Sequence, residues 1–428
     1  MSDPLRLGIA GLGTVGRGVV RIVQRHGELI AARAGRAIEI AAVSARDRSK
    51  DRGIDLSALA WEDDPVALAQ RADVDVFVEL VGGSDGVARE ATEAAIAAGK
   101  DVVTANKAML ALHGQALAGL AEARGHVIRF EAAVAGGIPV VKALTEGLAG
   151  NAITRVMGVM NGTCNYILTR MESAGLPYET VFEEARQLGY LEADPELDVG
   201  GIDAGHKLSL LAAIAYGTKV AFPAVELEGI GKVRIEDIRH AADMGYRIKL
   251  LGVAQMTGRG LEQRMSPCLV PADSPLGQLQ GGTNMVVLEG DSVGQIVLRG
   301  PGAGEGPTAS AVMSDVIEIA RGTRLSTFGQ PAATLRDPVP ARATAPAPHY
   351  LRMTLVDKPG ALAKVATVLG DEGISIDRMR QYQHSDTSAP VVLVTHSTTR
   401  DAIDHALSRL PATGVLTGEA VAIRIEKV

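Results

Sequence analysis

The sequence predicts an α/β protein built from three units: a doubly wound parallel sheet of Rossmann type, an α+β unit, and a C-terminal βαββαβ unit. Three observations lead to this prediction. Apolar runs alternate with helical stretches over residues 1–131, the order of strands and helices changes over 132–306, and five prolines fall within residues 331–349. With 428 residues, the chain is also too long for a single hydrophobic core.

The first unit is expected to hold a mostly parallel sheet, because helical stretches separate its apolar runs. Strands are predicted at Leu5–Ala10, Ile38–Ser44, Val74–Val81, Asp101–Thr104 and His126–Glu131. A helix predicted far downstream, at 307–321, has apolar residues at helical spacing. We expect that helix to pack back on the first unit.

The second unit, 132–306, is expected to be an α+β domain. Its predicted elements are a strand at Ile153–Met160, helices near Asn165–Ser173, Tyr178–Leu188 and Ile202–Tyr216, and strands near Lys249–Gln255 and Asn284–Gly290. The prolines of 331–349 favour extended, unpacked backbone, so this stretch is interpreted as a linker. Residues 350–428 then alternate strands and helices in the βαββαβ order.

Composition narrows the class of protein. The net charge is −7 and no block of Lys and Arg occurs, which argues against nucleic acid or an anionic membrane as partner. No signal peptide is recognised, and the longest apolar run is too short to span a bilayer. The two cysteines, Cys164 and Cys268, exclude a disulfide framework and a thiolate zinc site, and the scattered histidines argue against a His-based metal centre. We expect a soluble cytoplasmic enzyme.

A glycine-rich loop follows the first predicted strand and precedes a helix. It comprises Gly11, Leu12, Gly13, Thr14, Val15 and Gly16, and in this position GxGxxG is typical of dinucleotide binding at a helix N-terminus. The alternative is a tight turn without a ligand. After the second strand, Arg46 could pair with a 2′-phosphate and Lys50 could assist, which favours NADP; Asp47 leaves NAD open.

Two lysines are candidates for the chemistry. Lys207 follows Asp203 by four residues, so both share one face of a helix that is otherwise apolar all round. Lys107 follows a predicted parallel strand, where open α/β sheets bind ligands. A second ammonium group near Lys207 would favour proton release at lower pH. The alternatives are a solvated ion pair and a solvated lysine.

Several stretches together resemble homoserine dehydrogenase, in the bacterial form with a C-terminal ACT domain, over essentially the whole chain. Besides the glycine loop, they are TANK at 104–107, EAAVAGGIP at 131–139, NGTCNYIL at 161–168, LGYLEADP at 188–195, GPGAG at 300–304 and PTA at 307–309. The NGTxNYIL and LGYxEADP stretches are specific to the family. The dinucleotide loop is not.

The resemblance implies NAD(P)-dependent interconversion of L-homoserine and L-aspartate 4-semialdehyde, on the way to threonine and methionine. It implies Lys207 as proton donor to the substrate oxygen, with Lys107 in support and touching the cofactor. Glu192 and Asp203 match residues that hold the substrate amino group, and Asp198 belongs to the same acidic set. Gly304 matches a backbone cofactor contact, with Gly189 near it.

The resemblance also implies a monovalent cation, usually sodium, and a regulatory domain. The cation ligands would be Glu131 and the backbone carbonyls of Val134, Gly136 and Ile138, a ligand set that suits a hard cation. DKPGAL at 357–362 matches the DxPGxL loop of ACT domains, which pair edge to edge and bind amino acids. Threonine feedback and a homodimer or tetramer are therefore expected; the alternative is a purely oligomerising module.

Two other functions remain open on the sequence. An acylating semialdehyde dehydrogenase needs a thiolate nucleophile, for which Cys164 is the candidate near the mapped site. A non-catalytic amino-acid sensor could retain a dehydrogenase-like body, but it has no need of Lys107, Glu192, Asp203 and Lys207 together.

Overall fold

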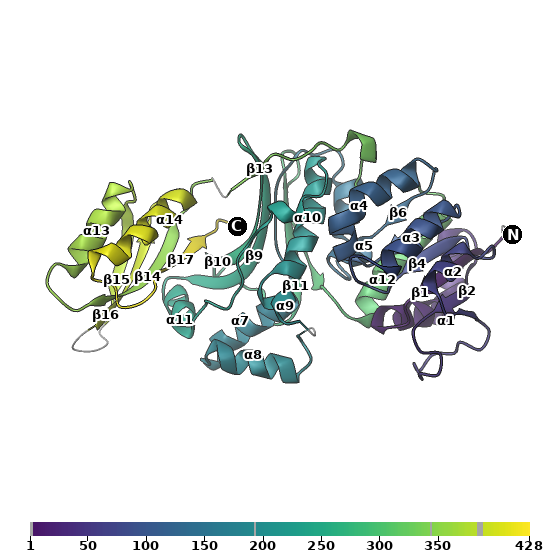
Figure 1. Ribbon diagram of the computed structural model, residues 1–428, viewed down its shortest axis with the longest axis horizontal. Helices are drawn as coiled ribbons and strands as arrows, with labels where there is room; N and C mark the ends of the chain where they lie inside the picture. Colours follow the sequence, from purple (N-terminus) through teal and green to yellow (C-terminus); the bar gives the residue numbers. More distant parts are fainter. Residues whose placement is uncertain (1–2, 192–193, 343–344, 383–387) are drawn as a thin grey trace.

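Figure 1 shows the chain as three parts in a row: the N-terminal sheet on the right, a mixed sheet in the centre and the C-terminal unit on the left. The computed structural model describes residues 3–191, 194–342, 345–382 and 388–428. Across those ranges, no helix combines the length and apolar character needed to cross a bilayer. The predicted fold class is confirmed.

The N-terminal sheet is parallel throughout, in the order β3-β2-β1-β4-β5-β6. Its strands are β1 (Leu5–Ala10), β2 (Ile38–Ser44), β3 (Ala60–Glu62), β4 (Val76–Glu79), β5 (Asp101–Thr104) and β6 (Ile128–Arg129). The strand order reverses between β1 and β4, and such a switch point is where doubly wound sheets bind their ligands. The sequence prediction lacked β3, which is three half-buried residues with no readable alternation.

Four helices of the same part are α1 (Thr14–Ala34), α2 (Pro65–Gln70), α3 (Val87–Ala97) and α4 (Lys107–Glu122). A fifth, α12 (Glu305–Ala320), comes from the far side of the middle domain and packs on α1. In Figure 1 the green α12 lies among the purple and blue elements. An added Cβ on Gly18 of α1 would lie 2.8 Å from the Ala309 Cβ, so the two helices are in close contact.

The central and C-terminal parts share one eleven-stranded sheet, with a main order of β12-β11-β7-β9-β10-β17-β14-β16-β15. The central strands are β7 (Ile153–Val159), β8 (Glu226–Leu227), β9 (Tyr246–Thr257), β10 (Gly260–Pro271), β11 (Thr283–Gly290), β12 (Gly294–Pro301) and β13 (Pro340–Ala341). The C-terminal strands are β14 (His349–Val356), β15 (Ile376–Gln381), β16 (Ser388–Thr395) and β17 (Val421–Ile425). The last strand, β17, joins the two parts by pairing in parallel with β10.

Helices cover this sheet and link it to the first. The central ones are α5 (Glu131–Val134), α6 (Val140–Lys142), α7 (Gly162–Ala174), α8 (Tyr178–Gln187), α9 (Glu196–Val199), α10 (Ile202–Tyr216) and α11 (Ile235–Asp243). The C-terminal unit has α13 (Ala361–Asp371) and α14 (Arg400–Arg409), which complete the predicted βαββαβ order. Single turns are η1 (Ala143–Gly147), η2 (Phe222–Ala224), η3 (Ala332–Thr334) and η4 (Leu410–Thr413).

The expectation of an unpacked linker at 331–349 is wrong. Residues Pro340–Ala341 form β13 on β10, the Leu261 N–H donates to the Val339 carbonyl at 2.8 Å, and the Lys219 N–H donates to that of Arg336, also at 2.8 Å. Extended backbone is suited to the edge of a sheet, where proline is tolerated. Residues 336–341 of this stretch are therefore bound along the central domain, while η3 precedes them as a turn and Ala347 forms a bridge with Thr398 of the C-terminal unit.

Candidate active site

Asp203 brings the two candidate lysines together. Its Oδ2 lies 2.7 Å from the Lys207 Nζ and its Oδ1 lies 2.9 Å from the Lys107 Nζ. Burial alone would raise the pKa of Asp203, but the two ammonium groups outweigh burial and hold the pKa well below its ordinary value. This carboxylate is therefore ionised and bridges two cations from different domains.

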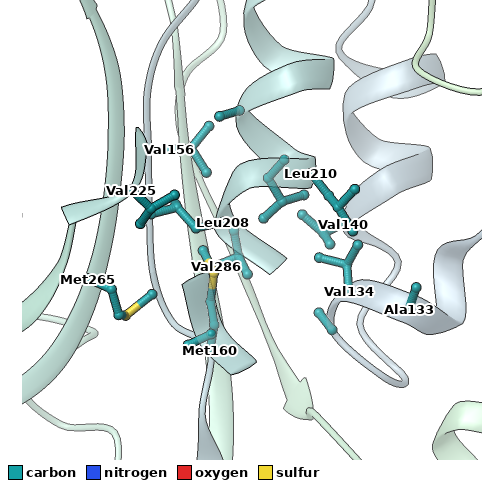
Figure 2. Close-up of a cluster of buried hydrophobic side chains, with 14 of the residues drawn as sticks. Ala133, Val134, Val140, Val156, Met160, Leu208, Leu210, Val225, Met265 and Val286 are labelled. Atoms are coloured by element: carbon teal, nitrogen blue, oxygen red, sulfur yellow. The ribbon is translucent and has the colours of Figure 1, made fainter. Parts of the chain in front are cut away.

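Lys207 is held in place by its helix and by one further bond. It lies in the first two turns of α10, whose remaining residues are mostly buried, and its side chain is 11 % exposed. Its Nζ also donates to the Met160 carbonyl at 2.9 Å. Figure 2 shows Met160 and Leu208, the residue after Lys207, within one buried hydrophobic cluster. The ammonium group thus stands at the edge of a dry core, as the apolar helix predicted.

Lys107 is oriented by the start of α4. The Asn106 side chain caps that helix by accepting from the Met109 N–H at 3.1 Å. The Asn106 N–H donates to the Thr104 hydroxyl oxygen at 2.9 Å, and that hydroxyl donates to the buried Glu79 carboxylate at 2.6 Å. This network ties the ends of β4 and β5 together and directs Lys107 toward α10.

A cavity of about 610 Å³ contains this ion triad. Most of the predicted site residues line it: Thr14, Val15, Lys107, Gly189, Asp198, Asp203, Lys207 and Gly304, together with Val134 and Gly136 of the expected cation site. The cavity thus reaches from the start of α1 to the start of α10. It is the space between the sheet's switch point and the central domain.

The glycine loop is shaped for close approach. Gly11 has a φ of +98°, and an added Cβ there would lie 2.3 Å from the Leu80 carbonyl oxygen. A Cβ on Gly16 would lie 2.0 Å from the Gly11 carbonyl oxygen. At Gly13, the residue before α1, an added Cβ would meet open space, which leaves room for a ligand at the helix N-terminus. Thr14 and Val15 of this loop line the cavity. The rest of the turn, which does not line it, is formed by Gly11, Leu12, Gly13 and Gly16.

Arg46 and Asp47 follow the end of β2. Arg46 is exposed after β2 and does not line the cavity, whereas the neighbouring Asp47 is bonded within its own loop, accepting from the Ser49 N–H at 2.9 Å and hydroxyl at 2.7 Å. Those bonds to Ser49 lower the pKa of Asp47. Glu192 lies outside the described residues.

Asp198 lines the cavity but bonds to a residue that the sequence reasoning had not assigned. Asn161 donates from Nδ2 to Asp198 Oδ1 at 2.9 Å, and its own Oδ1 accepts from the Cys164 N–H at 2.8 Å as the cap of α7. Thr163, Tyr190 and Asn284 also line the cavity and were not predicted. Asn161 and Thr163 lie in the NGT stretch and Tyr190 lies in the LGY stretch. An asparagine directly ahead of a helix is typical of an N-cap, and this pattern is the sequence signal for Asn161.

Cys164 cannot act as a nucleophile in this arrangement. Its side chain is fully buried, and its thiol donates to the Asp198 carbonyl at 3.2 Å. Burial, with the charges of Asp198 and Asp203, raises the pKa of this thiol well above its ordinary value. The finding argues against the acylating reaction that the sequence had left open.

Glu131 and the loop after it lie next to the cavity, which Val134 and Gly136 line. The Glu131 carboxylate is buried and accepts from the N–H groups of Val141 at 3.0 Å and Lys142 at 2.8 Å. Burial and the neighbouring Asp315 raise its pKa to about 7. The Ile138 carbonyl accepts from the Val140 N–H at 2.8 Å. Within the described ranges, no group of three or more His, Cys, Asp or Glu side chains could hold a metal ion, so carbonyl oxygens would have to complete such a site.

Comparisons with known proteins agree with this architecture. Residues 11–131 match the family model described as homoserine dehydrogenase, NAD binding domain, 139–317 match homoserine dehydrogenase, and 349–411 match the ACT domain. Homoserine dehydrogenases of Neisseria gonorrhoeae and Pseudomonas aeruginosa are each 42 % identical, with 99 % of both chains covered. The homoserine dehydrogenase of Bacillus subtilis is 36 % identical over 95 % of this chain and 94 % of its own.

Solved structures extend the likeness to the whole fold. The crystal structure of a homoserine dehydrogenase from Thiobacillus denitrificans has a TM-score of 0.93 at 38 % identity, covering 99 % of each chain. That of the Staphylococcus aureus homoserine dehydrogenase at pH 7.5 has a TM-score of 0.78 at 28 % identity, also covering 99 % of each chain. The chain therefore belongs to the homoserine dehydrogenase family, with an NAD-binding domain and a C-terminal ACT domain, and is an oxidoreductase that acts on a CH–OH group.

Proposed function

We propose that this chain interconverts L-homoserine and L-aspartate 4-semialdehyde, with Lys207 exchanging the proton at the substrate oxygen and Lys107 supporting it. The observation that carries the proposal is the Asp203 carboxylate, which holds both ammonium groups at 2.7 and 2.9 Å inside one cavity with the dinucleotide loop. We assign residues 1–131 with α12 to dinucleotide binding and 132–306 to substrate binding and dimerisation.

The hydrogen bonds of Lys207 support its role. An ammonium group has three donors, and two of them point to Asp203 and to the Met160 carbonyl. The third is the donor that we assign to the substrate oxygen. The nicotinamide, when bound, supplies or accepts the hydride at the neighbouring carbon. Cations held in place by Asp203 stabilise the negative charge that develops on that oxygen.

The substrate amino group is assigned to the acidic side of the cavity. Each Asp203 oxygen retains lone-pair capacity beyond its lysine, so this carboxylate can also accept from a substrate ammonium group. Asp198 and Glu192 complete the proposed set. His206 precedes Lys207, and burial lowers its pKa, so its ring is mostly neutral and has no proton to give as an acid. Its ring centroid also lies 4.1 Å from that of Phe222.

We favour NADP as the dinucleotide, bound by the loop Gly11–Gly16 with Gly189, Gly304 and Lys107 near the nicotinamide. The support is the exposed Arg46 after β2, next to an Asp47 carboxylate already bonded within its loop. A hyperthermophilic archaeal homoserine dehydrogenase, 26 % identical over 75 % of this chain, was solved in complex with NADPH. Arg46→Ala should weaken NADP binding at least tenfold and leave NAD binding unchanged; equal NADP affinity in the variant would remove Arg46 from this role.

We also propose a monovalent cation, sodium, on Glu131 and the carbonyls of Val134, Gly136 and Ile138. A buried carboxylate whose pKa is raised by burial fits a site that a cation would neutralise. Sodium chloride should raise the thermal unfolding midpoint above that in choline chloride, and Glu131→Gln should abolish the difference. An equal midpoint in the two salts, with wild-type protein, would contradict the proposal.

The ACT domain supports a proposal of regulation and assembly. We propose that paired ACT domains bind threonine as inhibitor and that the chain forms a homodimer or tetramer in the cytoplasm, in threonine and methionine synthesis. The free thiols of Cys164 and Cys268 fit a reducing compartment. Activity and thermal stability that are both unchanged by threonine would leave the domain an oligomerising role only.

One assay tests the reaction itself. Oxidation of NADPH by the purified chain is measured with L-aspartate 4-semialdehyde, and the assay is repeated with NADH instead of NADPH. The reverse reaction is measured with L-homoserine and each oxidised dinucleotide. We expect turnover in both directions, faster with the NADP pair. Absence of turnover with either dinucleotide would favour the non-catalytic sensor instead.

A further inference from the structure

A second cavity lies where the ACT domain joins the central sheet. It has a volume of about 250 Å³ and is lined by Glu226, Glu228, Arg264, Ser266, Arg342 and others from the central part, with His349, Arg400 and Arg424 from the ACT domain. Strand β8 pairs with β10 at Arg264 and Met265, and β17 pairs with it at Cys268 and Leu269. The cavity occupies the gap between those two pairings. None of the residues assigned to the active site lines it.

Arg424 lines this cavity and carries a buried guanidinium nitrogen without an acceptor in the described part of the chain. Its side chain is 7 % exposed, and its Nε donates to Glu426 Oε2 at 2.9 Å. That carboxylate is shared with Arg264, whose Nη2 lies 2.7 Å away. The Arg424 Nη1 is buried and has no hydrogen-bond partner among the residues that the structure describes. A buried guanidinium nitrogen without an acceptor is costly, and a carboxylate is the acceptor that fits it best.

His349 lies beside Arg424, because the two residues are paired across β14 and β17. The imidazole is fully buried, and neither ring nitrogen makes a hydrogen bond of normal geometry within the described ranges. Burial and the guanidinium groups of Arg424 and Arg400 lower its pKa to about 3, against an opposing contribution from the Ala347 backbone. The ring is neutral at physiological pH, so it offers one donor and one acceptor to a ligand.

The opposite wall carries two carboxylates, each paired with an arginine of the same lining. Glu226 lies 3.3 Å from Arg342, which is exposed, and Glu228 lies 3.8 Å from Arg400, which is partly exposed. Among the described residues, four arginines line the cavity beside the two carboxylates, so the lining suits a ligand that carries both charges. An apolar ligand would leave the Arg424 and His349 nitrogens unsatisfied. A small molecule with a carboxylate at one end and an ammonium group at the other satisfies both walls.

We propose that this cavity binds a free, zwitterionic α-amino acid, with its carboxylate on Arg424 beside His349 and its ammonium group on Glu226 and Glu228. Such a site goes beyond the effector site proposed for paired ACT domains, because it is complete within one copy of the chain. Bound ligand would link the ACT domain to β10.

The site has a short route to the catalytic helix. Met265 lies between the lining residues Arg264 and Ser266, and its side chain belongs to the hydrophobic cluster of Figure 2 with Met160 and Leu208. A Cβ added to Gly201, the residue before α10, would lie 3.0 Å from the Met265 Cγ. A shift of β10 on ligand binding would therefore press on the helix that carries Asp203 and Lys207.

The test is direct binding to the full-length chain by isothermal titration calorimetry. Each standard L-amino acid is titrated in turn, starting with L-threonine, and any that binds is compared with its amino alcohol and its N-acetyl derivative. Ala422→Leu, which adds bulk at the cavity lining, and Arg424→Gln, which removes the donor, are measured beside Arg409→Gln. Arg409 is an exposed ACT arginine paired with Asp371 and Glu372, so it serves as the matched control.

We expect one amino acid to bind, with affinity at least tenfold weaker in Ala422→Leu and Arg424→Gln and unchanged in Arg409→Gln. The amino alcohol, which lacks the carboxylate, and the N-acetyl derivative, which lacks the ammonium charge, should each bind at least tenfold more weakly than the amino acid. If Arg424→Gln fails to fold, Ala422→Leu and Arg400→Gln decide the question. Binding that survives Ala422→Leu would overturn the proposal, as would binding of the N-acetyl derivative with full affinity or no binding of any amino acid. Threonine inhibition that survives in Ala422→Leu would sink this site and leave the paired-ACT effector site standing.

Discussion

At Asp203, one half-buried carboxylate separates two ammonium groups that would otherwise repel each other. Asp203→Asn keeps the shape and removes the charge, so Lys107 and Lys207 lose their common acceptor. We expect kcat/KM for semialdehyde reduction to fall at least hundredfold, roughly the contribution of one positioned acid or base. Steady-state kinetics check this, with Asp404→Asn on α14, outside the active-site cavity, as control. A variant within threefold of wild type would show that the bridge is dispensable.

Cys164 provides the opposite expectation. Its thiol is buried beneath Asp198 with a pKa well above the ordinary value, so it is a small packing residue rather than a reactive one. Cys164→Ala should keep kcat within about threefold, at a stability cost of about 1 kcal/mol for the lost contacts. Kinetics and chemical denaturation measure the two effects separately. Loss of all activity in a folded variant would restore the acylating reaction.

Lys249 makes folding stability depend on pH. Burial lowers its pKa from 10.5 to about 8, partly opposed by Glu172, although Nζ donates to Asn165 Oδ1 at 3.0 Å and to the Leu279 carbonyl. A lysine whose pKa is lower in the folded state costs stability below that pKa, and the cost disappears as pH rises toward the unfolded value. The free energy of unfolding of wild type relative to Lys249→Met should therefore rise between pH 8 and 10.5, by up to about 3 kcal/mol. A difference that is flat with pH would contradict this account.

At the scale of elements, the packing of α12 on α1 can be tested with glycines of the same helix. Gly18 faces Ala309 at close contact, whereas an added Cβ on Gly27 meets nothing within 4 Å. Gly18→Ala should destabilise the protein by about 1–3 kcal/mol through overpacking. Gly27→Ala should be neutral or stabilising by up to about 1 kcal/mol, because alanine favours the helix. Denaturant unfolding of both variants checks this, and equal stabilities would argue against the close contact.

The elements that the sequence predicted correctly are those with a clear hydrophobic period. β1, β2, β5 and α10 have the predicted bounds, since each is a largely apolar run between polar or glycine residues. β10 was not predicted, although it is almost wholly buried, because Glu262 and Arg264 interrupt its apolar pattern. Their charges are compensated by each other and by Glu426, a partner far away in sequence. No local pattern reveals such a pairing.

The site residues likewise divide into those that a local sequence pattern identifies and those that depend on a distant partner. Lys107, Asp203 and Lys207 could be identified because ionisable residues stood at the edges of apolar elements, and the structure brings all three into contact. The contribution of Asn161 depends on its bond to Asp198, 37 residues away, and could not be derived from spacing. Spacing likewise could not show that Asp47 would bond within its own loop.

At the scale of the whole molecule, the ACT domain is continuous with the central sheet rather than tethered to it. β17 pairs with β10, and the buried Asp237 of α11 accepts hydrogen bonds from Arg352 and Tyr350 of β14, at 2.5 and 2.9 Å. Elements joined by a shared sheet and a buried ion pair are expected to unfold together.

Calorimetry should therefore show the ACT and central domains melting in one transition. Arg352→Met leaves the Asp237 charge buried without its ion-pair partner and should lower the free energy of unfolding by about 3–5 kcal/mol. The exposed Arg378→Met, also on an ACT strand, is the matched control. A separate early transition for the ACT domain in wild type would contradict the continuous-sheet interpretation.

The central claim is that Lys207 transfers the proton at the substrate oxygen in a homoserine dehydrogenase. Its most direct test is kcat for NADPH-dependent reduction of L-aspartate 4-semialdehyde by Lys207→Ala, beside Lys219→Ala, a lysine that pairs with Asp337 away from the cavity. We predict that Lys207→Ala lowers kcat by about 10²–10⁴-fold while still binding NADPH, and that Lys219→Ala is unchanged. A folded Lys207→Ala enzyme with wild-type kcat would contradict the claim.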